Sequence, residues 1–134
     1  MEKKLKIYAY VILDNHFHMI CQSQELSRTL QSLKRHTSKC ILEQLKQDQK
    51  NWILQLLAFY KKKHKKDSQH QLWQEGFHPQ QIISEVMFKQ KVEYIHQNPV
   101  KRGYVEAPED WCFSSAGEFL LDRRGPKQLD PVTL

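Results

Sequence analysis

Two histidines separated by one residue, His16 and His18, are the side chains in this sequence best placed to do chemistry. They lie in an apolar run rich in strand-forming residues, which predicts a β-strand over residues 16–21. Side chains alternate between the two faces of a strand, so we expect both imidazoles on one face. Two neighbouring imidazoles are half of a metal site, which needs at least one further ligand. The other face, which we expect to pack on a core, carries Phe17, Met19 and Cys21.

The elements around the histidines predict a β-hairpin. A second apolar run covers residues 5–13, and Asp14 and Asn15 between the two runs form a turn signal. The histidines are therefore expected directly after the hairpin turn.

The middle of the chain predicts helices. Apolar residues recur at helical spacing over residues 25–46, which predicts a long helix with Ser23 in its cap region. A shorter apolar stretch, Trp52 to Tyr60, predicts a second helix. A lysine-rich run over residues 61–66 follows, and its simplest interpretation is a solvated helix end rather than a dedicated DNA contact. The polar face of the long helix carries Arg28, Lys34, Arg35 and Lys39.

Residues 70–77 predict a further strand or edge segment. After them, Ser84 is a helix cap, and the pattern predicts a helix to about residue 97, ended by Pro99. The tail predicts irregular structure with one short helix over residues 114–121. The buried stripe of the capped helix is expected to consist of Phe88, Val92 and Ile95.

That helix places Tyr94 away from its buried stripe, with Asn98 one turn further on. A metal held by the histidine pair and the Asn98 amide oxygen could polarise a phosphodiester while the Tyr94 phenolate attacks the phosphorus. Tyrosine has a reference pKa of about 10, so it needs such assistance at neutral pH. The product would be a 5′-phosphotyrosine and a free 3′-hydroxyl, so strands could be rejoined without ATP. His96, two residues after Tyr94, is interpreted as structural.

The bulk properties are those of one soluble globular domain over residues 1–134. The net charge of +6 favours an anionic partner, most simply nucleic acid. No apolar run approaches the roughly 20 residues of a membrane span. Three widely spaced cysteines without a Cys-x-x-Cys pair predict reduced thiols and a cytoplasmic location, rather than a disulfide framework or a zinc knuckle; they are Cys21, Cys40 and Cys112.

Four segments in order resemble one known family. His16-Phe17-His18 is the His-hydrophobic-His pattern of the HUH nucleases, and residues 8–20 around it resemble the hairpin of the single-tyrosine HUH transposases. Residues 94–103 resemble their tyrosine helix, especially that of the REP-associated tyrosine transposases. Residues 73–79 and 109–116 are also typical of that branch. The resemblance covers about residues 5–120, and residues 121–134 form a tail.

The resemblance implies an α+β fold: a ferredoxin-like antiparallel sheet that includes the hairpin, with helices packed on it and the tyrosine on a following helix. It also implies cleavage and rejoining of single-stranded DNA near a small hairpin, with Mg²⁺ or Mn²⁺, by a protein that works as a homodimer. By position, His16 and His18 match the metal ligands and Tyr94 the nucleophile, and Asn98 stands where many members have a third ligand, Gln. The phosphate contacts are expected from Lys34, Arg35, Lys101 and Arg102.

The chain departs from the family pattern in two ways. Members carry a strand and a helix before the segment that starts here at Leu5. The chain is therefore a truncated copy, a copy with a misassigned start, or one whose sheet another chain completes. In addition, Asn98 precedes Pro99, so its side chain could cap the helix instead of reaching a metal.

Two alternative functions follow from the sequence. The first is a non-catalytic DNA-binding remnant of such a transposase. The second, a hydrolase with a His-x-His on a barrel strand, is disfavoured because such barrels need roughly 200 residues or more.

Overall fold

The computed structural model describes residues 5–61, 70–73, 77–122 and 129–132. The chain divides into two compact units. The hairpin unit consists of residues 1–24 and 80–134, and the helical unit of residues 25–79. The single domain over residues 1–134 stays a prediction.

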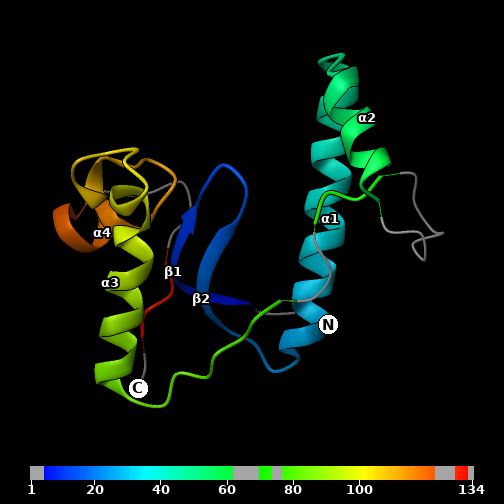
Figure 1. The fold of residues 1–134 in the computed structure, drawn as a ribbon. Helices are drawn as coiled ribbons and strands as arrows, with labels where there is room; N and C mark the ends of the chain where they lie inside the picture. Colours follow the sequence, from blue (N-terminus) through cyan, green and yellow to red (C-terminus); the bar gives the residue numbers. More distant parts are fainter. Residues whose placement is uncertain (1–4, 62–69, 74–76, 123–128, 133–134) are drawn as a thin grey trace. The chain divides into compact units, whose positions relative to one another are not determined.

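The hairpin unit is built on two antiparallel strands, β1 (Lys6–Ile12) and β2 (Phe17–Gln22) (Figure 1). Val11 lies opposite His18 in their register. The backbone N–H of Leu13 donates to the carbonyl oxygen of His16 at 2.8 Å and closes the loop between the strands. The predicted hairpin is confirmed, with His16 as the last loop residue rather than the first strand residue.

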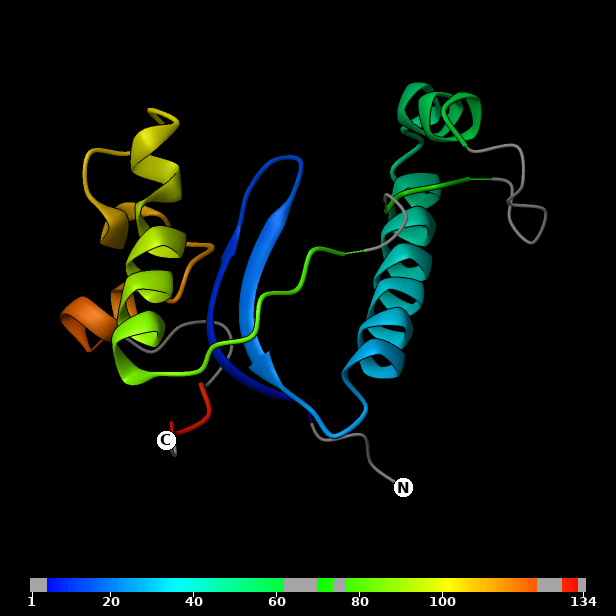
Figure 2. The ribbon, with the colours of Figure 1, turned by 60° about the horizontal axis from the view of Figure 1, so that its bottom comes forward.

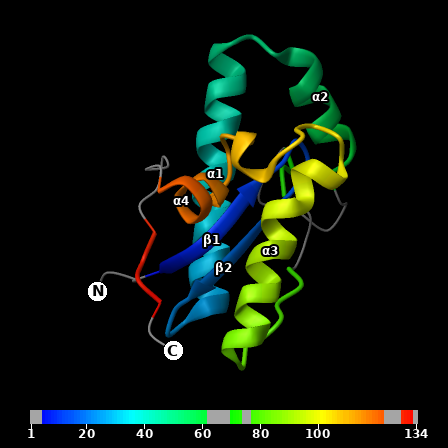
Figure 3. The same cartoon turned by 90° about the vertical axis from the view of Figure 1, so that its left-hand side faces the viewer.

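Helix α3 (Glu85–Lys101) packs against the hairpin (Figure 3). Its predicted N-cap is confirmed, because the Ser84 side chain accepts a hydrogen bond from the Met87 backbone N–H at 3.1 Å. The predicted stripe is also confirmed: two of its residues are buried in the core and the third packs against that core from a partly buried position. The core cluster contains Tyr8, Ala9, Val11, Leu13 and Ile20 from the hairpin, with Val92 and Ile95 from α3.

Pro99 does not end α3, contrary to the sequence prediction. The helix continues to Lys101 with Pro99 inside it. Proline removes one backbone donor from a helix and crowds the preceding turn. Here its ring is fully buried, and the Pro99 carbonyl oxygen accepts from the Tyr104 N–H at 3.0 Å. Burial of the ring offsets the lost hydrogen bond, so the helix gains one more turn.

The core of the hairpin unit lies on the histidine face of β2, which also differs from the prediction. Ile20 is buried in the core cluster, and it shares a face with His18 because it is two residues further along the strand. Val11, opposite His18, is fully buried in the same cluster. Helix α3 therefore covers the face that carries the imidazole. The residues expected to form the core face, Phe17, Met19 and Cys21, are only half-buried.

The outer edge of β1 is covered by residues from much later in the chain. The short helix η1 (Pro108–Asp110) and helix α4 (Ala116–Leu121) flank part of this covering segment, and α4 confirms the short helix predicted there. The contacts are Ile12 N–H to the Phe113 carbonyl at 2.8 Å, Tyr10 N–H to Ser115 Oγ at 2.9 Å, and Ile7 N–H to Asp130 Oδ2 at 2.8 Å.

The helical unit contains α1 (Leu26–Gln47) and α2 (Asn51–Phe59), and both predicted helices are confirmed (Figure 2). Ser23 lies two residues before the N-cap position of α1. The N-cap residue is Glu25, which makes no side-chain cap bond. The strand predicted over residues 70–77 is wrong for the described residues 70–73 and 77, which form no strand. Instead, Trp73 Nε1 donates to Thr37 Oγ1 on α1 at 2.9 Å. Most of the lysine run, residues 62–66, lies outside the described residues.

The fold class is mixed helix and strand, with a two-stranded antiparallel sheet in the part of the chain that the structure describes. The ferredoxin-like arrangement stays a prediction. Across those same residues, no helix has the length and apolarity needed to cross a bilayer.

Candidate active site

The two histidines lie side by side. The ring centres of His16 and His18 are 5.1 Å apart, and the rings are nearly perpendicular. The Nδ1 atom of His16 is 2.6 Å from the side-chain oxygen of Asn15. Because an amide oxygen can only accept, this contact suits the tautomer with its proton on Nδ1, in which Nε2 would be the nitrogen available to a ligand. Neighbours of this kind fix the orientation of metal-binding imidazoles in proteins.

Local electrostatics favour the neutral form of His18. Burial lowers its pKa below the usual value of 6.5, and the nearby His16 and Arg102 lower it further. These effects favour the neutral imidazole, which is the form that binds metal ions.

Helix α3 brings Tyr94 to the histidine pair. The ring centres of Tyr94 and His18 are 5.9 Å apart in an edge-to-face arrangement. Tyr94 is 51% exposed although it sits on a helix that packs on the hairpin. The Lys101 ammonium nitrogen lies 5.2 Å from the centre of the Tyr94 ring, at a distance typical of cation–π contacts. A tyrosine and a lysine of α3 thus meet an imidazole of the hairpin, which is far from them in sequence, at one partly exposed place.

Asn98 is inside α3, one turn after Tyr94. It does not cap the helix end, because the C-cap residue is Arg102. Residues four apart on a helix share a face. Asn98 therefore lies on the same side of α3 as Tyr94, and the sequence-based concern about its helical geometry does not apply.

An ion pair links the end of α3 to the hairpin loop. Arg102 lies 3.6 Å from the Asp14 carboxylate. Lys101 and Arg102, both expected to contact phosphates, are thus next to the tyrosine and the histidines. Lys34 and Arg35 lie on α1, in the helical unit.

Sequence reasoning missed two neighbours of the histidines. The sequence marks Asp14 and Asn15 only as a turn, yet their side chains contact Arg102 and His16. Their position directly before His16 was the available signal. The contact between Asp14 and Arg102 had none, because it joins residues far apart in the chain.

The donor atoms fit a first-row transition metal. Imidazole nitrogen suits Mn²⁺ better than Mg²⁺, which prefers oxygen ligands. In the described residues, no three His, Cys, Asp or Glu side chains gather as a metal-binding group. Within the described residues, a metal at His16 and His18 could take further ligands from neutral oxygens, such as the Asn98 amide, or from substrate and water.

The comparisons with known proteins agree with the motifs. The chain is 28% identical over 111 residues to a curated Haemophilus influenzae protein named "Putative REP-associated tyrosine transposase". The match covers 80% of this chain and 56% of that relative, so the chain spans about half of the relative's length. No protein-family model matches the chain, and no solved structure matches it. The resemblance to the REP-associated tyrosine transposases is confirmed by this relative.

Proposed function

We propose that this chain is a single-stranded DNA transposase or endonuclease of the single-tyrosine HUH type. It would cleave and rejoin DNA through a covalent 5′-phosphotyrosine. The observation that carries the proposal is the contact between Tyr94 and His18, whose ring centres are 5.9 Å apart, beside the neighbouring ring of His16. The name of the curated relative supports a transposase of this family.

Tyr94 acts as the nucleophile in this proposal. Its hydroxyl oxygen forms a bond to the phosphorus, and the bond from phosphorus to the 3′ oxygen breaks. The proton lost by the tyrosine balances the proton gained by the leaving 3′-hydroxyl. A 3′-hydroxyl from another strand reverses the same exchange and restores the free tyrosine. One phosphodiester is exchanged for another, so no external energy source is needed.

The histidine pair and Asn98 would hold the divalent cation, Mg²⁺ or Mn²⁺. When bound, the cation would offset the negative charge that develops on the phosphate oxygens. Lys101 and Arg102 would contact the phosphates on either side of the cleaved bond. Lys34 and Arg35 are proposed as further DNA contacts, on the helical unit.

The proposed substrate is a single strand that carries a small hairpin, and the proposed assembly is a homodimer. The positive charge of the chain suits a phosphate backbone. A short hairpin leaves unpaired bases at its foot, where a single-strand nuclease can reach the backbone.

A covalent-adduct assay tests the proposal. The chain is incubated with labelled hairpin-bearing single strands and Mn²⁺ or Mg²⁺, then run on a denaturing gel. We expect a protein–DNA band that is lost with Tyr94→Phe and with a chelator. Tyr104→Phe is the matched control, since Tyr104 is also an exposed tyrosine and should keep the band. A band that persists in Tyr94→Phe contradicts the assignment.

The second candidate is a non-catalytic DNA-binding remnant. The net charge of +6 suits DNA binding without catalysis as well as DNA binding with it. A remnant would bind the same hairpin DNA without forming an adduct under any metal condition. Binding with no adduct on a library of hairpin sequences therefore selects the remnant over the enzyme.

A further inference from the structure

The whole net charge of the chain lies in the helical unit. Residues 25–79 contain eleven Lys and Arg against five Asp and Glu, whereas the rest of the chain contains ten of each. The hairpin unit, which carries the tyrosine and the histidines, is therefore neutral in sum. A separate basic unit is a surface for a polyanion.

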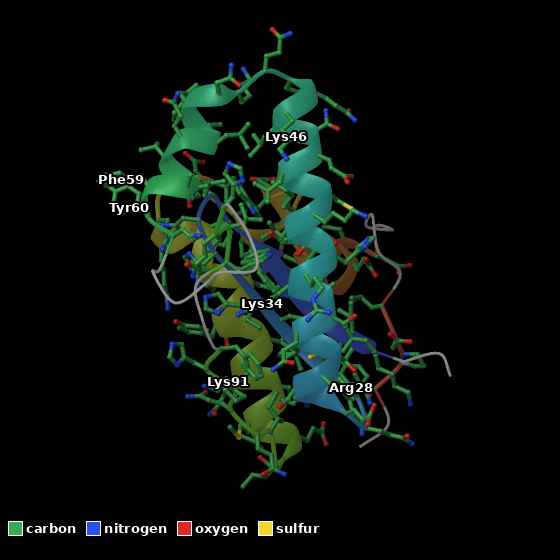
Figure 4. The ribbon with its side chains drawn as sticks, turned by 90° about the vertical axis from the view of Figure 1, so that its right-hand side faces the viewer. Arg28, Lys34, Lys46, Phe59, Tyr60 and Lys91 are labelled. Carbon is green, nitrogen blue, oxygen red and sulfur yellow. The ribbon has the colours of Figure 1, made fainter. Side chains whose placement is uncertain are left out.

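Part of this charge forms a stripe along α1. The spacing of seven, four and seven residues places four basic side chains within about 20° of one line on the helix. All four are exposed, and one of them, Arg28, lies 3.6 Å from the exposed Glu25 carboxylate. At a rise of about 1.5 Å per residue the stripe is about 27 Å long. Figure 4 labels two of its members near the two ends of α1. The basic stripe consists of Arg28, Arg35, Lys39 and Lys46.

Helix α2 presents an exposed aromatic face. Trp52 is 64% exposed, and Phe59 and Tyr60 are 79% and 73% exposed. Phe59 lies seven residues after Trp52 and so shares a side of the helix with it, and Leu56 lies between them. Tyr60 is the C-cap residue directly after Phe59. The rings of Phe59 and Tyr60 are 5.0 Å apart, edge to face. Figure 4 shows both side chains at the outer side of α2.

An exposed aromatic face of this kind marks an interaction site. The positive charge of the helical unit indicates which kind of partner binds there. A second copy would bring together two units of net charge +6, which disfavours association through this face. A single-stranded nucleic acid supplies both phosphates for the cations and unpaired bases for the rings. We propose that the helical unit is a binding module for single-stranded DNA, in which Trp52, Phe59 and Tyr60 stack on unpaired bases and the basic stripe contacts the backbone. That the strand is DNA rests on the proposed function.

The test separates stacking from charge. The full chain carrying Tyr94→Phe, which cannot form an adduct, is titrated with a labelled oligothymidine and with an abasic strand of equal length and charge. We expect the oligothymidine to bind at least tenfold more tightly, since stacking on aromatic rings favours strands with bases. The double substitution Phe59→Leu and Tyr60→Leu keeps the face apolar and removes the rings. It should weaken oligothymidine binding about tenfold or more and leave the abasic strand unchanged.

Two control variants remove an aromatic ring outside the helical unit and two charges of the basic stripe. Phe119→Leu removes a half-exposed ring from the hairpin unit and should change neither affinity. Arg35→Gln with Lys39→Gln should weaken both strands equally. It should also lower the salt dependence by about 0.7 log units per log[salt] for each lost contact.

Four outcomes overturn the proposal: equal affinity for the two strands, leucine variants that bind oligothymidine as tightly as the parent, tighter binding of oligouridine than of oligothymidine, or a dimer in sedimentation that the leucine variants abolish. Failure of the proposed function looks different. In that case the parent chain forms no adduct, while the preference for the base-bearing strand and its loss in the leucine variants remain.

Discussion

The Nε2 atom of His96 lies 2.7 Å from the Oγ of Ser115, and both side chains are buried. The same Oγ accepts a hydrogen bond from the Tyr10 N–H on the outer edge of β1. One buried hydroxyl thus joins α3, the segment before α4 and the hairpin. His96 is structural, as the sequence analysis expected, and burial lowers its pKa to about 4.

This buried imidazole makes stability depend on pH. The folded pKa of about 4 lies below the usual value of 6.5 in the unfolded chain. As the pH falls from 6.5 towards 4, the unfolded chain takes up a proton that the folded chain does not. The free energy of unfolding should therefore fall, by up to about 3 kcal/mol at pH 4. Urea unfolding at pH 7 and pH 5 measures the loss, which His96→Gln should reduce.

The control for this prediction is His78→Gln. His78 is exposed, so its substitution should leave the pH dependence unchanged. A pH dependence that is the same in His96→Gln as in the parent contradicts the assignment to His96.

Ser115→Ala should destabilise the hairpin unit without touching the candidate site. It leaves the Tyr10 N–H and the His96 ring nitrogen without their buried partner, and each buried unsatisfied group costs about 1–3 kcal/mol. Thermal unfolding of the variant checks this. Ser27→Ala, at an exposed position of α1, should leave the unfolding temperature nearly unchanged, and an equal effect of the two substitutions would argue against the buried network.

His18→Gln should weaken Mn²⁺ binding by more than tenfold, because it replaces an imidazole donor of the proposed site with an amide. Titration of free Mn²⁺ by electron paramagnetic resonance measures this without DNA. His36→Gln, on the exposed side of α1, is the matched control. The adduct band should disappear in His18→Gln and return in the parent chain when Mn²⁺ is restored after chelation. Undiminished Mn²⁺ affinity in His18→Gln would place the metal elsewhere.

Lys101→Met should weaken single-strand binding and reduce its salt dependence. The substitution keeps an unbranched apolar side chain and removes the ammonium group near the Tyr94 ring, whose charge is proposed to contact a phosphate. One lost contact lowers the slope by about 0.7 log units per log[salt]. Lys89→Met is the control, since Lys89 is paired with Glu85 at 2.9 Å near the start of α3. Equal slopes for the parent and Lys101→Met would remove Lys101 from the interface.

The local elements could be predicted from the sequence, because their signals are short in range. Two apolar, strand-forming runs and the Asp14–Asn15 turn between them predict the hairpin, and apolar spacing predicts α1, α2 and α3. Pro99 does not mark the end of α3, although proline destabilises a helix locally. The burial of its ring depends on the fold around it.

The arrangement of the candidate site was predictable only in part. The histidine pair and Tyr94 can each be recognised from a short sequence motif. The structure brings the two motifs together, as the resemblance to the HUH transposases implies. The choice of core face on β2 depends on where α3 packs, which no local pattern specifies. The pairing of Arg102 with Asp14 likewise depends on the fold, since the two residues are 88 positions apart in the sequence.

The residues that cover the outer edge of β1 also affect the tendency of the protein to aggregate at high concentration. A bare strand edge offers a row of donors and acceptors to any other strand, and it is a common starting point for aggregation. Here Phe113, Ser115 and Asp130 occupy the outward-facing backbone groups of Ile12, Tyr10 and Ile7. These contacts come from loops and side chains rather than from another strand, so they do not create a new strand edge. At these three residues of β1, the backbone groups are not available to pair with a strand of another molecule.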